Sequence, residues 1–283
     1  MRVTKQQKPV RSANRRRKTN SLNTGYWLGL DLGGTSIKAA VVDTRKGTLT
    51  TDVIRAKTPQ PATPKGVVAA IGELAKKLKW NGPVGVGFPG LIKHGVVRRA
   101  PNLDAAWVRH EIVDHLRRAL GVSFVAVGND ADAAGLAEAR FGAGRGVRGT
   151  VVLVTLGTGI GSAVLHNGSL LPDTELGHLE VGGQDAEKFA STVARERNKW
   201  GWEQWGRNVD RYLTTLEYML APDLFIIGGG VSSDPEQFFR YLENVEAKIV
   251  PATMGNDAGI VGAALFAVHG VKALARKRRR AKE

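Results

Sequence analysis

Short apolar runs and longer amphipathic segments alternate along the chain from residue 26 onward. An apolar run of about four to eight residues bounded by glycine predicts a strand, and apolar residues recurring every three or four positions predict a helix. We therefore expect strands at 26–31, 37–43, 48–57, 84–88, 124–127 and 224–227, with two more inside 150–165. Helices are expected at 65–79, 105–120, 130–141, 185–197, 203–220, 235–248 and 258–275.

Two of the expected hairpins share one layout: an apolar strand, a turn of small residues and a second apolar strand. The first is centred on Gly33 and Gly34, and the second on residues 157–161. Such a repeated unit predicts a two-lobed α/β protein. We expect a small N-terminal lobe at 25–128, a large C-terminal lobe at 129–257, and a helix at 258–275 that packs back on the first lobe.

The net charge of +15 is concentrated at the two ends of the chain. Residues 1–20 contain eight Lys and Arg and no acid, and residues 271–283 contain seven Lys and Arg and one Glu. The 250 residues between them carry 26 basic and 25 acidic side chains. We expect a disordered basic arm at 1–24 and a basic tail at 276–283, which either contact polyanions or only aid solubility. Because the body is nearly neutral, a nucleic-acid partner is not expected.

The chain has no cysteine, which excludes disulfides and thiolate zinc sites. No uninterrupted apolar run reaches the roughly 18 residues of a membrane helix. Residues 1–24 also lack the apolar stretch of a secretory signal peptide. We therefore expect a cytoplasmic protein without a membrane partner.

Three glycine-rich turns follow apolar strands, and each is a candidate phosphate or ligand site. The first is Asp31-Leu32-Gly33-Gly34-Thr35-Ser36-Ile37-Lys38, the second is Gly157-Thr158-Gly159-Ile160-Gly161, and the third is Gly228-Gly229-Gly230-Val231. Glycine lets backbone N–H groups approach an anion, while Thr35 and Ser36 add hydroxyl donors. A carboxylate at a strand end, as at Asp31, can hold Mg²⁺ directly or through water. Each turn alone is compatible with a purely structural role.

A second group of candidates carries carboxylates and an imidazole. Asn129-Asp130 stands at a strand end just before a helix, where Asp130 is either an ordinary helix cap or a general base. Glu175, His178 and Glu187 follow the second turn. Such side chains can form paired hydrogen bonds with adjacent hydroxyls and so select one polyol.

Asp-Leu-Gly-Gly-Thr at 31–35, Gly-Asn-Asp at 128–130, Leu-Gly-Thr-Gly-Ile-Gly at 156–161 and Gly-Gly-Gly-Val at 228–231 resemble, in this order, the motif series of the actin/hexokinase superfamily. Within it they resemble the ROK family of sugar kinases and repressors, over nearly all of residues 26–270. The resemblance implies a two-lobed, ribonuclease H-like fold with a cleft between the lobes.

The resemblance also implies a role for each candidate residue. Asp130 would be the catalytic base, and Asp31 would stand near Mg²⁺, directly or through water. The sugar ligands would be Asn129, Asp130, Glu175, His178 and Glu187. The phosphate-binding residues would be Gly33, Gly34, Thr35, Lys38, Gly157, Thr158 and Gly159, and the adenosine pocket would be bordered by Gly228, Gly229 and Gly230.

One departure from the family pattern is informative. Many ROK proteins hold a structural zinc with a His and three Cys between the two Glu positions, whereas the segment from His178 to Glu187 is short and has no Cys. We therefore expect no structural zinc. This shortened form resembles the polyphosphate glucokinase branch of the family, including the polyphosphate/ATP glucomannokinases.

These features together predict an enzyme that phosphorylates the 6-hydroxyl of glucose, and also of mannose, with polyphosphate, ATP or both. Two alternatives remain open: a sugar-responsive ROK-type regulator, and a polyanion-binding protein without kinase activity. Residues 1–24 are too short and too polar for the helix-turn-helix of a regulator. A homodimer is compatible with the sequence.

Overall fold

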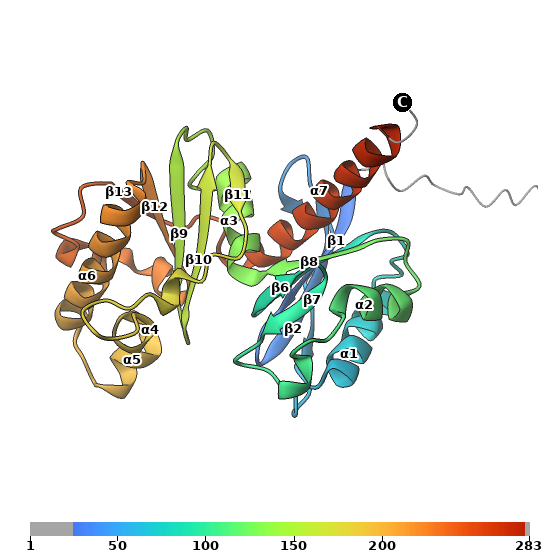
Figure 1. Ribbon diagram of the computed structural model, residues 1–283, viewed down its shortest axis with the longest axis horizontal. Coiled ribbons are helices and arrows are strands. Elements are labelled where there is room, and N and C mark those ends of the chain that lie inside the picture. Colours follow the sequence, from blue (N-terminus) through green and yellow to red (C-terminus); the bar gives the residue numbers. More distant parts are fainter. Residues whose placement is uncertain (1–24, 281–283) are drawn as a thin grey trace, which may run out of the picture.

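The computed structural model describes residues 25–280 of the 283-residue chain. Its strands form two large mixed sheets that lie side by side, the first at the right and the second at the left of Figure 1. The two-lobed α/β architecture expected from the sequence is confirmed. The basic arm predicted at 1–24 and the last three residues of the predicted tail lie outside the described residues.

The first sheet has the order β3-β2-β1-β5-β8, with β4 pairing to β2. Strand β2 is antiparallel to β1, β3 and β4, while β5 and β8 run parallel to β1. Helices α1 and α2 pack on one face around Leu30, Val86 and Trp107. The bounds are β1 Tyr26–Leu32, β2 Ser36–Asp43, β3 Thr48–Leu49, β4 Ile54–Lys57, α1 Pro64–Lys77, β5 Val84–Phe88, α2 Ile112–Leu120 and β8 Val125–Asn129, with a small hairpin of β6 Leu91–Lys93 and β7 Val96–Arg99.

The second sheet has the order β11-β10-β9-β12-β13. The β9–β10 hairpin is antiparallel, and β12 and β13 continue the sheet in parallel with β9. One face is covered by α4, α5 and α6, with Trp205, Tyr212 and Phe238 fully buried beneath them. The bounds are β9 Thr150–Leu156, β10 Ile160–His166, β11 Ser169–Leu171, α4 Glu187–Ala190, α5 Thr192–Arg197, α6 Trp202–Leu220, β12 Leu224–Gly228 and β13 Lys248–Pro251.

Helices α3 (Asp130–Phe141) and α7 (Ala258–Arg280) lie between the two sheets (Figure 1). The helices touch because Gly262 lies against the backbone of Ala133, where an added Cβ would meet the carbonyl oxygen at 1.7 Å. Gly85 of β5 likewise allows α7 to lie on the first sheet, since a Cβ there would meet the Ala263 oxygen at 1.7 Å. Glycine at these two positions therefore lets α7 lie close to α3 and to the first sheet.

The segment Gly255–Lys277 is long and apolar enough to cross a membrane by length and composition, with a mean hydropathy of 1.7. Its apolar residues Ile260, Val261, Ala264 and Leu265 are nevertheless buried against the sheets and α3. The segment thus contains the core helix of this fold, and its apolar character is explained by burial between two lobes.

The start of α7 is fixed by a buried carboxylate on α3. Glu138 is fully buried, and its side chain accepts backbone N–H bonds from Ala143 at 2.8 Å, Thr253 at 2.9 Å and Met254 at 2.7 Å. A buried carboxylate with three such donors is compensated for its lost hydration. The loop that enters α7 is therefore tied to the helix that begins at Asp130.

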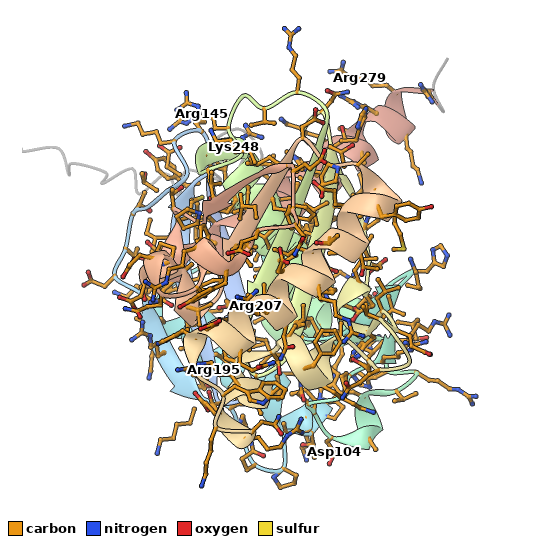
Figure 2. All side chains as sticks on the ribbon, turned by 90° about the vertical axis from the view of Figure 1, so that its left-hand side faces the viewer. Asp104, Arg145, Arg195, Arg207, Lys248 and Arg279 are labelled. Carbon is orange, nitrogen blue, oxygen red and sulfur yellow. The ribbon has the colours of Figure 1, made fainter. Side chains whose placement is uncertain are left out.

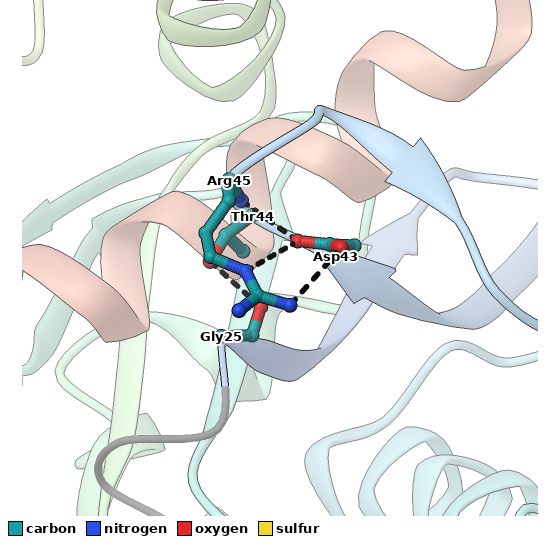
Figure 3. A network of polar contacts seen from close by, with 4 residues as sticks. All are labelled: Gly25, Asp43, Thr44 and Arg45. Atoms are coloured by element: carbon teal, nitrogen blue, oxygen red, sulfur yellow. Dashed lines mark hydrogen bonds and ion pairs between the residues drawn. The ribbon is translucent and has the colours of Figure 1, made fainter.

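Gly25, which directly precedes β1, is held by a small polar network at the end of β2 (Figure 3). The Thr44 backbone N–H and hydroxyl both donate to the Gly25 carbonyl, at 2.9 and 3.0 Å. The Arg45 guanidinium bonds both carboxylate oxygens of Asp43 and lowers the pKa of that carboxyl. These contacts anchor β1 at the position where it enters the sheet.

Two of the helices predicted from the sequence do not form as expected. In place of a helix at 105–120, the chain forms a short 3₁₀ turn and then α2, because Arg109 N–H donates to the Val97 carbonyl at 2.8 Å and Val97 N–H to the His110 carbonyl at 3.0 Å. In place of a helix at 235–248, the chain forms two 3₁₀ turns and an extended segment that becomes β13. Phe238 and Leu242 are buried there on an irregular backbone.

Smaller differences occur at helix ends. The helix expected at 185–197 is divided at Ser191, whose side chain caps α5 by accepting the Ala194 N–H at 3.1 Å. The last helix continues to Arg280, five residues beyond its predicted end at 275. Ala, Leu, Lys and Arg are strong helix formers, so the basic sequence after 275 does not end the helix.

Candidate active site

A central cavity of about 590 Å³ lies between the lobes. It is lined by both predicted phosphate turns and by the predicted carboxylate and imidazole residues. The residues are Gly33, Gly34, Thr35, Asn129, Asp130, Gly157, Thr158, Gly159, Glu175, His178 and Glu187. Segments distant in sequence therefore meet in one cavity.

An adjoining cavity of about 490 Å³ contains the remaining predicted residues, namely Asp31, Lys38, Gly228, Gly229 and Gly230. Asp130, Thr155 and Gly229 line both cavities. The two spaces therefore meet at Asp130, which stands where a ligand in one cavity would touch a ligand in the other.

The first turn is held from outside by the segment after β4. The Gly33 carbonyl accepts the Thr58 hydroxyl at 2.7 Å, the Thr35 carbonyl accepts the Thr58 N–H at 3.0 Å, and the Gly34 carbonyl accepts the Gln60 side-chain amide at 3.2 Å. Carbonyl oxygens that would repel an anion are thus engaged by protein donors. The contacts therefore reduce the repulsion that an anion at this turn would meet.

The second turn is supported in the same way by α4 and α5. The Gly157 carbonyl accepts the Thr192 N–H at 3.1 Å and its hydroxyl at 2.6 Å. Glu187 Oε2 accepts the Ile160 N–H at 3.0 Å, and a Cβ on Gly159 would lie only 2.3 Å from that oxygen. A side chain at position 159 would therefore displace the Glu187 carboxylate, which supports the turn as well as lining the central cavity.

Asn129, and not Asp130, is the cap of α3. The Asn129 side-chain oxygen accepts the N–H groups of Ala131 at 2.8 Å and Asp132 at 3.1 Å, which satisfies two of the free donors of the helix. Its amide nitrogen donates to Glu175 Oε1 at 3.3 Å. This arrangement frees the Asp130 carboxyl to face the cavities, with Oδ1 also accepting the Ala131 N–H at 2.8 Å.

The electrostatic surroundings of Asp130 raise its pKa to about 7. Burial is the main cause, because the carboxylate loses hydration at the base of the cleft. The negative charges of Asp31 and, to a smaller extent, Glu175 add to the effect, while the Ala131 N–H opposes it. A carboxyl group with a pKa near neutrality is suited to accept a proton from a substrate hydroxyl.

Asp31 and Lys38 lie side by side in the β1–β2 hairpin, with 3.1 Å between Lys38 Nζ and Asp31 Oδ2. Lys38, expected to bind phosphate, is thus already paired with the predicted metal residue. Within residues 25–280 there is no group of three or more His, Asp or Glu that could hold a metal. A carboxylate beside the predicted phosphate turn fits Mg²⁺, which takes one or two protein carboxylates together with substrate phosphates.

Three polar residues of the site were missed by the sequence analysis. Asp185 Oδ2 lies 3.1 Å from His178 Nδ1 and holds the imidazole in place. Ser162 donates to the Thr174 carbonyl and accepts the Leu176 N–H at 3.0 Å, which fixes the segment that carries Glu175. Local sequence contains only a weak signal for them, namely an acid two residues before Glu187 and a hydroxyl in a buried strand.

The third missed residue is Asp132, which is buried in the first turn of α3, two positions after Asp130. Its Oδ2 accepts the Asp173 N–H at 2.8 Å, and burial raises its pKa to about 7. Asp173 also pairs with Lys93 of the first lobe at 2.8 Å. These contacts connect α3, the segment before Glu175, and the β6–β7 hairpin.

Two mixed sheets, two glycine turns facing each other across a cleft and a carboxylate between them define a fold of the hexokinase type. The model of the ROK family matches residues 27–193, more than half of the chain. The protein belongs to the ROK family.

Characterised relatives and solved structures agree with this placement. The chain is 49% identical over 243 residues to the polyphosphate glucokinase of Mycobacterium tuberculosis, covering 86% of this chain and 91% of that protein. The inorganic polyphosphate/ATP-glucomannokinase of Arthrobacter sp. strain KM has a similar structure, with a TM-score of 0.82 and 47% identity, covering 87% of this chain and 99% of that chain. A ROK family glucokinase from Streptomyces griseus, solved with glucose and AMPPNP, has a TM-score of 0.74 and 30% identity, covering 86% and 99% of the two chains.

Proposed function

We propose that this protein is a hexokinase-type phosphotransferase that phosphorylates the 6-hydroxyl of glucose with inorganic polyphosphate, ATP or both. The observation that carries the proposal is the position of Asp130 at the junction of two cavities, with the glycine turns of both lobes lining the larger one. The similarity to a polyphosphate glucokinase and to a polyphosphate/ATP-glucomannokinase supports the choice of sugar and donor.

The sugar would occupy the central cavity against Asn129, Asp130, Glu175, His178 and Glu187. Asp130 accepts the proton of the 6-hydroxyl as that oxygen attacks the terminal phosphorus in line. The new oxygen–phosphorus bond forms while the bond to the leaving phosphate breaks, which releases glucose 6-phosphate and ADP or a shortened polyphosphate. The Asp185–His178 contact holds the imidazole so that its other nitrogen is available to a sugar hydroxyl.

The donor would extend from the central cavity into the adjoining one. The N–H groups of Gly34, Thr35, Thr158 and Gly159 would hold the phosphates, and Gly228–Gly230 would border the adenosine of ATP. Gly33 and Gly157 would contribute by shaping the turns, because their N–H groups donate to the carbonyls of Ser36 and Gly159, each at 2.9 Å. Mg²⁺, held near Asp31, would supply positive charge against the phosphates when it is bound. Closing of the lobes would exclude water, which would otherwise hydrolyse the donor.

Mannose is included among the proposed substrates, because one of the similar solved structures is that of a polyphosphate/ATP-glucomannokinase. A cytoplasmic location belongs to the same proposal, because ATP and hexose phosphates are found inside cells. A homodimer remains a prediction from the sequence.

The test is a coupled assay for glucose 6-phosphate, run first with ATP and then with long-chain polyphosphate, each with Mg²⁺ and with chelator. We expect turnover with at least one donor and its loss when Mg²⁺ is removed. A protein that binds polyphosphate but forms no glucose 6-phosphate with either donor would support the polyanion-binding alternative and refute the kinase.

A further inference from the structure

Basic side chains form a row on the first sheet, beginning at the adjoining cavity. The strand register places Asp31 of β1 opposite Lys38 of β2, and Lys38 opposite Arg55 of β4. Residues directly opposite each other in antiparallel strands project from the same face. Lys57 lies two residues beyond Arg55 and opposite Ser36, so it projects from that face as well.

The neighbours on β4 confirm this orientation. Ile54 and Ala56 pack into the core beneath α1 and α2 together with Ile37, on the other face of the sheet. Arg55 and Lys57 alternate with them and are exposed. Their charged groups therefore lie on the same side as Asp31 and Lys38, which line the adjoining cavity.

The two outer members of the row have no acidic partner. Lys38 pairs with Asp31 at 3.1 Å, but within residues 25–280 neither Arg55 nor Lys57 forms an ion pair or hydrogen bond to another side chain. Among residues 25–280, some exposed cations, such as Lys76 and Arg117, are paired with acids one helical turn away, whereas Lys65 and Lys77 of α1 form no ion pair and so match Arg55 and Lys57 in this respect. Two neighbouring cations without acids form a site that would favour an anion.

The row is continuous with the first phosphate turn. Lys57 is followed directly by Thr58, which bonds the carbonyls of Gly33 and Thr35. Neighbouring strands lie about 4.8 Å apart, so the row extends roughly 10 Å from Asp31 on β1 to Arg55 on the edge strand β4. An anion that leaves the glycine turn on this side would pass these cations in succession.

A second group of cations, Arg195 and Arg197 on α5, is less suited to binding an anion. Both side chains are already engaged within the second lobe. The Arg195 guanidinium lies 3.7 Å from the centre of the Trp202 ring, and Arg197 donates to the Lys188 carbonyl at 3.1 Å. Figure 2, which views the second lobe from its outer side, labels Arg195 there.

We propose that Lys38, Arg55 and Lys57 form an exit track for inorganic polyphosphate, binding the part of the chain that extends beyond the cleft. The inference rests on the proposed function. ATP would contact Lys38 alone among the three, because Lys38 lines the same cavity as the Gly228–Gly230 wall that would border the adenosine, whereas Arg55 and Lys57 lie outside that lining. Short polyphosphates end before the edge strand and would not reach Arg55. The track thus distinguishes long polyphosphate from both other donors.

The test compares Arg55→Ala/Lys57→Ala with a matched control, Lys65→Ala/Lys77→Ala, which removes two exposed lysines from α1 on the opposite face of the sheet. Michaelis constants are measured at low salt for long-chain polyphosphate, tripolyphosphate and ATP. We expect the track variant to raise KM for long polyphosphate roughly 2- to 30-fold, which corresponds to two exposed charge contacts. Its kinetics with ATP and tripolyphosphate and its kcat should stay at the wild-type level, as should all kinetics of the control.

Salt provides a second readout, because contacts between exposed charges are screened. The difference between wild type and the track variant should disappear at high ionic strength. The track would be refuted if wild type and the track variant had equal KM values for long polyphosphate, or if the control variant showed the same rise in KM. Neither result would affect the proposed kinase function. Turnover with ATP alone would refute both polyphosphate use and the track, and no turnover with any donor would refute the proposed function itself.

Discussion

Replacing Asp130 by Asn tests the central claim about the site, namely that the fold holds a carboxylate there at a cost in stability. Asn has nearly the same shape, and its side-chain oxygen can still accept the Ala131 N–H, which lies 2.8 Å from the carboxylate in the native protein. The change therefore removes the charge and the proton acceptor while the packing is retained.

The expected magnitude follows from the pKa of Asp130, which rises from 3.8 to about 7. Each pKa unit corresponds to about 1.4 kcal/mol, so keeping this group ionised in the folded state costs about 4 kcal/mol. Between these two pKa values the folded state binds more protons than the unfolded state, and stability falls as pH rises. Asn avoids this cost. We expect the variant to be more stable than wild type by about 4 kcal/mol at pH 8 and by about 2 kcal/mol at pH 5.

Urea unfolding at pH 5 and pH 8 measures the stability difference, and the glucose 6-phosphate assay measures the rate. We expect kcat to fall by about 10²- to 10⁴-fold, the usual contribution of a general base, while glucose binding survives. The control is Asp114→Asn on the exposed side of α2, where the carboxylate pairs with Arg117 at 3.1 Å. It should change stability by at most about 1 kcal/mol and leave the rate unchanged.

Two results would refute the reasoning. A near-normal rate in the Asn variant would remove Asp130 from the role of base. A stability difference that does not grow between pH 5 and pH 8 would show that burial does not raise the pKa of this carboxyl.

Three further predictions concern neighbouring groups. The rate constant kcat/KM should decline below about pH 7, because protonated Asp130 cannot accept the hydroxyl proton; a profile flat to pH 5 would contradict the pKa given for it. Asp185→Asn should raise KM for glucose about 2- to 12-fold with little change in kcat, since it weakens the contact that orients His178; unchanged KM in sugar titrations would exclude that role. Glu138→Ala should destabilise the fold by at least about 3 kcal/mol in urea unfolding, because three backbone N–H groups lose their buried acceptor, and a loss below 1 kcal/mol would contradict this account.

The parts of the site that could be predicted from sequence are those whose geometry is local. A glycine turn between two apolar strands, as at 31–38 and 157–161, is formed within about ten residues, and its ability to approach an anion follows from glycine itself. The same holds for Asn129 and Asp130 at a strand–helix junction. The order of these segments was sufficient to predict the family and the two-lobed fold.

The two wrong helices show where local patterns fail. Residues 105–120 and 235–248 have helical spacing, but their backbone groups bond to Val97 and to Asp210, which accepts the Asn244 N–H at 3.0 Å. Tertiary hydrogen bonds and the burial of Phe238 outweigh a weak helical preference.

The sequence by itself therefore determined the central strands of both sheets, the glycine turns, the family and the residue types available for chemistry, because each depends on short-range pattern. It did not predict the short strands β6, β7, β11 and β13, and it joined β3 and β4 into one strand. Only the tertiary structure decided that Asn129 caps α3 while Asp130 faces the cavities, that Asp185 supports His178, and that Arg55 and Lys57 continue the row from Lys38. These depend on strand register, burial and the distance between charges far apart along the chain, and such quantities exist only once the lobes are folded against each other.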